Sequence, residues 1–230
     1  MTFTRATWNC AKVMLALTLP LQVVISSNRP RNTHHFCSRQ ALEILKRDGL
    51  RRQALVLQTH LDAMNQGSLW CDRGFKNISH YYDSLEDTGL WHGPDAPTEC
   101  RHYFNRAIKK WRQGDYQKAS FYLGAASHIL QDLCVPHHAR GQVFGGHQSF
   151  ENRARDHYED FAVHDEGIYD LSDCAGNWVK QNAAFSAVFL PQVKENNDLS
   201  VIDDIIDILL KRSQKTTAGF LHFFLRSASS

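Results

Sequence analysis

Imidazole and carboxylate side chains with chelating spacing are concentrated between residues 128 and 151. His128 and Asp132 are four residues apart, and His147 and Glu151 repeat that spacing, with His138 between the two pairs. On a helix, residues four apart project from one face, one turn apart. Zinc binds imidazole nitrogen and carboxylate oxygen, and a rigid pair of this kind holds two donors at chelating distance. Two such pairs joined by a third histidine favour a metal site over solvated or helix-capping polar residues.

The elements that carry these residues have helical periodicity, with almost no alternating strand pattern. Apolar stripes predict seven or so helices, over residues 33–47, 51–64, 98–111, 116–133, 147–163, 173–189 and 199–225. We expect Thr33 and Thr98 to cap two of them, Gly67 to end the second, and Gly219 to weaken the last. The small residues 124–126 suit close helix packing. The sequence therefore predicts an all-α fold with a single compact multi-helix domain.

The segment from Gly67 to Pro97 differs from the rest of the chain. It is rich in Gly, Asp, Asn and aromatic residues and has no sustained period. This pattern predicts a long loop, and long ordered loops in compact domains are usually functional. The loop contains two further residues of the metal-binding types, Asp72 and His80.

Composition fits one globular domain with a sizeable core, because the 230 residues are 43% hydrophobic and 22% charged. The formal net charge of +2 is too small to indicate a nucleic-acid partner by itself. Thirteen histidines are unusual and agree with metal or proton chemistry. The six cysteines include no C-x-x-C pair, which argues against a cysteine zinc cage, and export would allow one or two disulfides.

The N-terminal segment has the features of an export signal. Arg5 and Lys12 are positive, residues 13–25 are largely apolar, and the small residues Ser26 and Ser27 follow. The apolar run is too short for a comfortable membrane span. We expect residues 1–27 to be a signal segment, residues 28–230 to be the catalytic domain, and the protein to be secreted or periplasmic. An uncleaved N-terminal anchor is the alternative.

Motifs along nearly the whole chain resemble those of one family. His128-x-x-x-Asp132, Pro136-x-His138-Ala139 and His147-x-x-x-Glu151 are similar to the metal motifs of the zinc-dependent phospholipase C family, which includes Bacillus-type phosphatidylcholine-hydrolysing enzymes and the catalytic domain of clostridial alpha-toxin. Segments 67–72, 80–83, 111–124 and 214–220 also resemble that family. The likeness covers about residues 32–226. It implies an all-helical fold around a trinuclear-type zinc cleft. We expect no C-terminal β-sandwich of the kind that alpha-toxin carries.

The resemblance also implies which residues bind zinc. Asp72, His80, His128 and Asp132 would bind the first ion, His138, His147 and Glu151 the second, and His34 and Asp132 the third. Asp132 would bridge two ions. In relatives a tryptophan at the mature N-terminus completes the third site, and here no tryptophan lies in the ten or so residues before His34. We therefore expect two zinc ions, and three if the mature N-terminus completes the third site.

The function implied by the resemblance is hydrolysis of phospholipids at a membrane surface. Metal-activated water would release diacylglycerol and a phosphorylated head group, with Asp72 as the catalytic general base. We expect a monomer without a nucleic-acid partner. The head group stays open, because Arg73 follows Asp72 where relatives have an aromatic residue. Phe75, Tyr81 and Tyr82 are the aromatic residues available to surround a choline group.

Two other functions stay open. S1/P1-type single-strand nucleases share the trinuclear arrangement, but they end their motif with His-x-x-x-Asp, whereas this chain has His147-x-x-x-Glu151. The second is a zinc-stabilised, non-catalytic binding protein, against which the intact Asp72 argues. The remaining histidines are assigned structural roles: His35 and His137 beside the ligands, and His60, His92, His102, His157, His164 and His222 without paired spacing.

Overall fold

The apolar periodicity of the sequence forms eight α-helices in the computed structural model of the chain, which describes residues 32–194 and 197–229. The helices are α2 (Thr33–Arg47), α3 (Arg51–Gln58), α4 (Leu61–Cys71), α5 (Ala96–Arg112), α6 (Tyr116–Asp132), α7 (His147–His157), α8 (Ala175–Ser186) and α9 (Leu199–Ser229). Short 3-10 turns lie between them: η1 (Gly74–His80), η2 (Leu90–His92), η3 (His138–Arg140), η4 (Tyr158–Phe161) and η5 (Ala187–Gln192). Over these ranges there is no strand, so the predicted all-α class is confirmed.

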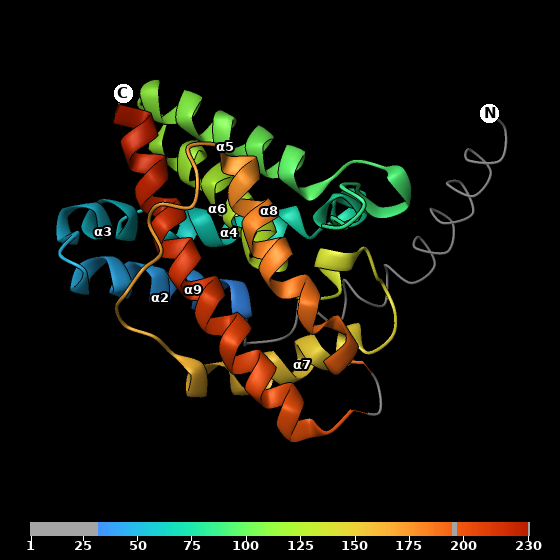
Figure 1. Cartoon of the computed structure of the whole chain (residues 1–230). Coiled ribbons are helices and arrows are strands. Elements are labelled where there is room, and N and C mark those ends of the chain that lie inside the picture. The colour runs from blue at the N-terminus through green and yellow to red at the C-terminus, as the bar shows by residue number, and fades with distance from the viewer. Residues whose placement is uncertain (1–31, 195–196, 230) are drawn as a thin grey trace, which may run out of the picture.

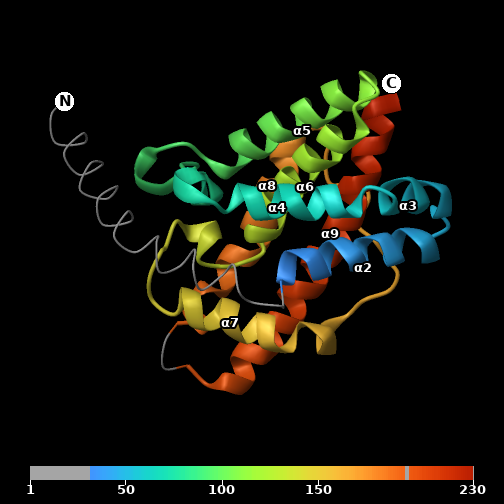
Figure 2. The ribbon, with the colours of Figure 1, turned by 180° about the vertical axis from the view of Figure 1, so that it is seen from behind.

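Helix α6 lies at the centre of the molecule. It packs against α2, α4, α5, α8 and α9, and from Leu123 to Asp132 every residue is buried. Figures 1 and 2 show α4 and α5 on two sides of α6, with the long α9 crossing the domain. The small residues Gly124, Ala125 and Ala126 on α6 allow its neighbours to approach closely.

Two glycines bring α4 and α6 into backbone contact. A Cβ added at Gly67 would lie 1.8 Å from the carbonyl oxygen of Phe121, and one at Gly124 would lie 1.9 Å from that of Met64. The predicted close packing at Gly124 is confirmed. The predicted helix end at Gly67 is wrong, because α4 continues to Cys71. The close approach places the end of α4, and Asp72 directly after it, against α6.

Other helix boundaries also differ from the sequence prediction. The helix predicted over residues 51–64 is divided at Thr59 and His60 into α3 and α4. The N-caps are Asn32 and Asp95, whose side chains accept hydrogen bonds from the backbone amides of His35 and Thr98. The predicted caps at Thr33 and Thr98 are therefore wrong, since a residue one or three positions earlier supplies the carboxyl or amide oxygen that capping favours.

The predicted helix over residues 147–163 ends at His157 and continues as a 3-10 turn, whereas α9 runs without interruption past Gly219. Gly219 does not weaken α9. A Cβ there would lie 1.7 Å from the carbonyl oxygen of Ile168, so this glycine permits close packing of the 162–174 segment. The segment is also held by Asp48, which accepts hydrogen bonds from the backbone amides of Glu166 and Gly167.

Two hydrophobic clusters hold the helices together. The larger includes Trp178, Phe220 and Phe224, all fully buried, and joins α5, α6, α8 and α9. The smaller joins α2, α7 and α9 through Phe36, Phe150 and the buried α9 residues between 205 and 210. Each such side chain contributes about 1.5–3 kcal/mol when removed from water. The smaller cluster fixes α7, and with it the second histidine and carboxylate pair.

The predicted export signal, residues 1–27, lies outside the described residues. Within residues 32–194 and 197–229, no helix combines the length and apolarity that crossing a membrane requires. The five cysteines in these ranges are free thiols rather than members of the disulfides that export would allow. Four of them are buried, and burial raises the pKa of the Cys37 thiol to about 12.

Candidate metal centre

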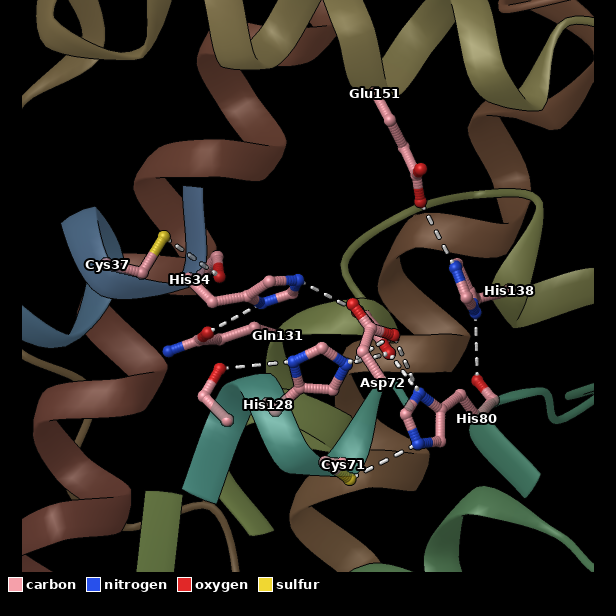
Figure 3. Close-up of polar contacts among 12 residues, drawn as sticks. His34, Cys37, Cys71, Asp72, His80, His128, Gln131, His138 and Glu151 are labelled. Carbon is pink, nitrogen blue, oxygen red and sulfur yellow. Dashed lines mark hydrogen bonds and ion pairs between the residues drawn. The ribbon is translucent and has the colours of Figure 1, made fainter. Parts of the chain in front are cut away.

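Five predicted ligands come together in what we call the buried cluster: His34, Asp72, His80, His128 and Asp132. His34 comes from the first turn of α2, Asp72 from the C-cap of α4, and His80 from the end of η1. His128 and Asp132 lie one turn apart on α6, as their spacing predicted. Figure 3 shows the His34, His80 and His128 rings and the Asp72 carboxylate directed toward a common centre. Residues from four separate elements thus converge on one point.

Asp132 is the carboxylate at the middle of the buried cluster. Its Oδ2 lies 2.9 Å from His80 Nδ1 and 3.1 Å from His128 Nε2, whereas its Oδ1 lies 3.5 Å from His34 Nε2. Neither His80 Nδ1 nor His128 Nε2 makes a hydrogen bond, although both atoms are buried. Their close contacts are with the carboxylates of the cluster, so ring nitrogens and carboxylate oxygens gather at one buried point, as cation ligands do. The two oxygens of Asp132 face different histidines, which fits a bridging carboxylate.

Three further predicted ligands form what we call the loop cluster: His138, His147 and Glu151. Glu151 Oε1 lies 3.3 Å from His138 Nε2 and 2.8 Å from His147 Nε2. His138 lies on η3, and His147 and Glu151 lie one turn apart on α7. Gly145 and Gly146 have φ of 80° and 100°, so these residues allow the sharp turn into α7. All eight predicted ligands therefore lie in two neighbouring clusters.

The histidine rings are oriented by hydrogen bonds on the side opposite to the clusters. These contacts join His34 Nδ1 to Gln131 Oε1 (2.9 Å), His80 Nε2 to Cys71 Sγ (3.3 Å), His128 Nδ1 to Ser68 Oγ (3.2 Å) and His138 Nδ1 to the carbonyl oxygen of His80 (3.0 Å). A metal-binding histidine typically uses its second ring nitrogen in this way, which sets the tautomer and the ring orientation. Sequence reasoning missed Ser68, Cys71 and Gln131, because no spacing rule links them to a ring that they contact only in the fold.

In the buried cluster, the charges of the carboxylates and of His128 offset one another. Burial opposes ionisation of Asp132, but the adjacent His128 holds the pKa of Asp132 well below its usual range. Burial likewise opposes the charge on His128, yet Asp132 and Asp72 raise the pKa of His128 well above its usual value. Burial and the positive charge on His128 lower the pKa of His34 to about 4. Asp132 is therefore an anion and His34 a neutral ring at pH 7.

The loop cluster has the same balance around one carboxylate. Burial raises the pKa of Glu151, but the neighbouring His147 and His138 lower it well below its usual range. His138 in turn is desolvated, while Asp132 and Glu151 raise its pKa. In each cluster the opposite charges offset the free-energy cost of burying them, which would be large for an isolated charge.

Asp72 differs from the other carboxylate of the buried cluster in its access to solvent. Its Oδ1 lies 3.4 Å from His128 Nε2, yet its side chain is 56% exposed, compared with 6% for Asp132. Desolvation by neighbouring atoms raises the pKa of Asp72, but the charge on His128, its hydrogen bond and the charge on His80 together lower the pKa below its usual value, so the carboxylate is ionised. Asp72 is thus the cluster carboxylate that a bound substrate or an attacking water can reach.

The histidines that were assigned structural roles lie outside the clusters. His137 is fully buried, and its ring stacks on that of His147 with the centroids 5.0 Å apart. Its Nε2 hydrogen-bonds the carbonyl oxygen of Gly145 at 3.2 Å. His35 bonds the carbonyl oxygen of Asn65, and none of the others joins a group of potential ligands in the described ranges.

Zinc fits the donor set. The groups His80–His128–Asp132, His34–Asp72–His128 and His138–His147–Glu151 each present ligand atoms within 4.8 Å of one another. Imidazole nitrogen with carboxylate oxygen is a zinc donor set. The described residues thus form an all-helical domain whose clustered side chains suit a zinc centre.

Comparison with known proteins gives the family. The sequence model of the zinc-dependent phospholipase C family matches residues 33–186, which include all eight predicted ligands. The chain belongs to the zinc-dependent phospholipase C family. It is 24% identical to a phospholipase C of Clostridium perfringens (strain 13 / Type A) over 236 residues, and 24% identical to a phospholipase C of Listeria monocytogenes over 245 residues. The first alignment covers 86% of this chain and 59% of the relative, the second 92% and 84%.

Solved structures agree on the fold. The alpha toxin of Clostridium absonum superposes with a TM-score of 0.77 at 23% identity, over 86% of this chain and 65% of that protein. An alpha-toxin of Clostridium perfringens from an avian strain superposes with a TM-score of 0.73 at 22% identity, over 86% of this chain and 64% of that one. The chain thus spans less than two thirds of the length of these clostridial relatives.

Proposed function

We propose that this protein is a zinc-dependent phosphodiester hydrolase that cleaves phospholipids to diacylglycerol and a phosphorylated head group. The observation that carries the proposal is the convergence of five histidines and three carboxylates from the sequence-predicted set into two adjacent clusters. His34, Asp72, His80, His128 and Asp132 would hold the ions of the buried cluster, and His138, His147 and Glu151 that of the loop cluster. Residues 28–230 would form the catalytic domain, exported by residues 1–27 and acting as a monomer.

The chemistry divides between the metal and the protein. Bound zinc supplies positive charge that neutralises a phosphodiester and makes water more acidic. Asp72, ionised and open to solvent, would orient the attacking water and accept its proton. Asp132 and Glu151 hold the histidine rings in place and balance their charge. The surrounding hydrogen bonds keep these groups oriented before substrate arrives, so that little reorganisation is needed during the reaction.

Two exposed apolar side chains on segments that carry predicted ligands support a lipid substrate over a nucleic acid. Leu85 is 71% exposed and Phe144 is 81% exposed, and both lie on segments that carry predicted ligands. These segments are joined where the Ser84 amide donates to the carbonyl oxygen of Ala139 at 3.2 Å. Figures 1 and 2 show both segments at the same end of the molecule. Exposed apolar residues beside a site favour contact with a membrane surface.

Head-group preference would depend on residues beside Asp72 and the loop cluster. Tyr81 is buried, and its ring stacks on that of His138 with centroids 4.4 Å apart, so this ring packs beside a ligand. Tyr82 has its hydroxyl bonded to Asp87 at 2.5 Å and Lys180 over its ring. Arg73, exposed next to Asp72, would favour an anionic head group.

Three substrates tested in parallel separate the candidate functions. Zinc-loaded protein is incubated with phosphatidylcholine vesicles, phosphatidylglycerol vesicles and single-stranded DNA, and diacylglycerol and nucleotides are measured. Zinc-dependent release of diacylglycerol supports the proposal, and the ratio between vesicles gives the head-group preference. Release of nucleotides without diacylglycerol would favour the S1/P1-type nuclease. Zinc binding with no product would favour a binding protein.

An Asp72 variant checks that the activity belongs to this site. Asp72→Asn is expected to lower diacylglycerol release by at least about 100-fold, because general base catalysis alone contributes about 10²–10⁴-fold. Asp204→Asn removes the same charge from an exposed position on α9 and serves as the matched control. Equal activity of the two variants would contradict the role of Asp72.

A further inference from the structure

A series of buried hydrogen bonds connects α9 to His34. The Thr217 hydroxyl donates to the carbonyl oxygen of Ser213 at 2.6 Å, and its oxygen accepts from Gln131 Nε2 at 3.2 Å. Gln131 Oε1 in turn contacts His34 Nδ1 at 2.9 Å. Gln131 is 4% exposed and Thr217 is fully buried. Figure 3 shows the Gln131 amide against the side of the His34 ring that faces away from the cluster.

The direction of each hydrogen bond follows from the first. The hydroxyl of Thr217 has one proton, which it donates to Ser213, so its oxygen can only accept from the Gln131 amide nitrogen. The Gln131 oxygen therefore faces His34 and requires a donor there. His34 Nδ1 must carry the ring proton, which leaves a lone pair on His34 Nε2. The side chains thus select one tautomer of His34.

In that tautomer, the lone pair on His34 Nε2 faces the carboxylate of Asp132. His34 Nε2 lies 3.5 Å from Asp132 Oδ1, and in this tautomer both atoms are acceptors. A ring that binds a cation through Nε2 keeps its single proton on Nδ1, which is the nitrogen that faces Gln131. Two facing acceptors repel each other unless a cation lies between them. The arrangement is therefore costly in itself and becomes favourable when a metal ion binds both atoms.

We propose that Gln131, held by Thr217, is a positioning residue that fixes the Nδ1-protonated tautomer of His34 and so prepares the zinc site shared by His34 and Asp132. The inference rests on the proposed zinc dependence. It assigns the preparation of this site to α6 and α9, through side chains that bind no metal themselves. The site would then be oriented whatever residue forms the mature N-terminus.

Two buried threonines on α9 provide a matched pair for the test. Thr217 accepts from Gln131, whereas Thr216 accepts from Asn182 Nδ2 at 3.0 Å and donates to the carbonyl oxygen of Arg212 at 2.9 Å. Both are fully buried, and both would become valine without loss of shape. Only Thr217 is linked to His34. The variants therefore separate an effect on the ligand from a general effect on α9.

The experiment measures zinc affinity by competition with a chelator in the full-length protein. Gln131→Met is expected to weaken one zinc ion by about 10- to 100-fold, the usual cost of losing a hydrogen bond to a ligand. Thr217→Val should weaken the same ion by a smaller factor, and Thr216→Val should leave all affinities unchanged. Unaltered zinc affinity in Gln131→Met, or an equal loss in Thr216→Val and Thr217→Val, would overturn the proposal.

A spectroscopic measurement reports the tautomer directly. In metal-free, ¹⁵N-histidine-labelled protein, the long-range ¹H–¹⁵N spectrum assigns the protonated nitrogen of His34, with His34→Gln identifying its signals. The expected result is an Nδ1-protonated ring in the wild type and in Thr216→Val, and a loss of that preference in Gln131→Met. An Nε2-protonated ring in the wild type would contradict the proposal, even if Gln131→Met failed to fold.

These two experiments measure zinc affinity and the position of the ring proton of His34, and neither measures lipid products. If zinc affinity responds as expected but phospholipids are not cleaved, the proposed function fails and the role of Gln131 stands. If phospholipids are cleaved and Gln131→Met binds zinc like the wild type, only the role of Gln131 fails.

Discussion

The buried cluster and the loop cluster use the same chemical groups but are held very differently. In the buried cluster, the rings of His34, His80 and His128 contact Gln131, Cys71 and Ser68 on their far sides, and the central Asp132 is 6% exposed. In the loop cluster, the carboxylate of Glu151 is 37% exposed. There, the ring of His138 contacts the carbonyl oxygen of His80 on its far side, and His147 and Glu151 are on a helix packed mainly through the smaller hydrophobic cluster.

The difference indicates a division of roles. Ligands fixed by helices and by hydrogen bonds cannot relax easily, so ions in the buried cluster should be held tightly and exchange slowly. The carboxylate of Glu151 is more open to solvent than that of Asp132, so an ion held by the loop cluster should exchange faster. Four substitutions, in decreasing order of expected effect, test this comparison.

The largest effect is expected from Asp132→Asn. The change removes the carboxylate that faces three histidines, so zinc affinity at the buried cluster should fall by more than the roughly 10- to 100-fold cost of altering a ligand's hydrogen-bond partner. Hydrolysis should fall by at least as much. Zinc content is measured by elemental analysis after dialysis. Loss of activity with unchanged zinc content would contradict the ligand role of Asp132.

Glu151→Gln should affect only the loop cluster. One zinc ion should be lost at a concentration where the buried cluster remains loaded, and thermal stability should change less than in Asp132→Asn. The reason is that Glu151 contacts His138 and His147 but none of the buried cluster ligands in the described ranges. Titration with chelator, followed by elemental analysis, gives the number of zinc ions that remain bound to each protein molecule. Simultaneous loss of every ion would show that the two clusters are not independent.

Ser68→Ala tests the hydrogen bonds behind the rings. It removes the partner of His128 Nδ1 and should weaken zinc at the buried cluster by about 10-fold, with the loop cluster unchanged. Ser120→Ala is the matched control, because Ser120 is also fully buried but its hydroxyl has no hydrogen-bond partner. Zinc affinity is measured by competition titration in both variants. Equal affinities in Ser68→Ala and Ser120→Ala would contradict the idea that hydrogen bonds behind the rings make the buried cluster bind zinc more tightly.

The smallest effect is expected at the surface contact between α7 and α9. Asp203 accepts from Arg153 Nη2 at 2.5 Å, whereas Asp207 pairs with Lys211 within α9 at 2.6 Å. Exposed ion pairs contribute about 0.2–1 kcal/mol. Asp203→Asn should therefore speed zinc exchange at the loop cluster at most about fivefold. Asp207→Asn, which leaves α7 untouched, should not change the exchange rate. An equal change in both variants would show that the contact between Arg153 and Asp203 does not slow zinc exchange.

The same contact makes a pH prediction. The hydrogen bond from Arg153 lowers the pKa of Asp203 below its value in the unfolded chain, which is about 3.9. The contribution of the pair is therefore fully present above that value and is lost as the pH falls through the lowered folded pKa. The difference in unfolding free energy between wild type and Asp203→Asn should be constant from about pH 5 to 8 and shrink in stronger acid.

Local spacing predicted part of the two clusters, and the resemblance to a family was needed for His34, Asp72 and His80, whereas the groups that hold the rings could not be predicted. His128 with Asp132, and His147 with Glu151, are helical pairs whose geometry does not depend on the rest of the fold. Gln131 contacts His34 across 97 positions of sequence, and no periodicity encodes that contact. Periodicity likewise does not encode the contacts of Ser68 with His128 and of Cys71 with His80.

The fold was predictable to a similar extent. Helical periodicity gave the class and most helices, but Gly67 was misassigned because a glycine that ends a helix and a glycine that allows two backbones to touch have the same sequence signature. The distinction depends on Phe121, which only the fold brings to Gly67. The break at Thr59 and His60 was missed because neither residue disrupts a helix strongly.

The most direct test of the metal centre is anomalous diffraction at the zinc absorption edge from crystals of the zinc-loaded protein. The structure predicts anomalous peaks within the buried cluster, including one between His34 Nε2 and Asp132 Oδ1, and one among His138, His147 and Glu151. Zinc bound elsewhere, with these side chains still paired only with one another, would contradict the assignment of a zinc-dependent catalytic centre.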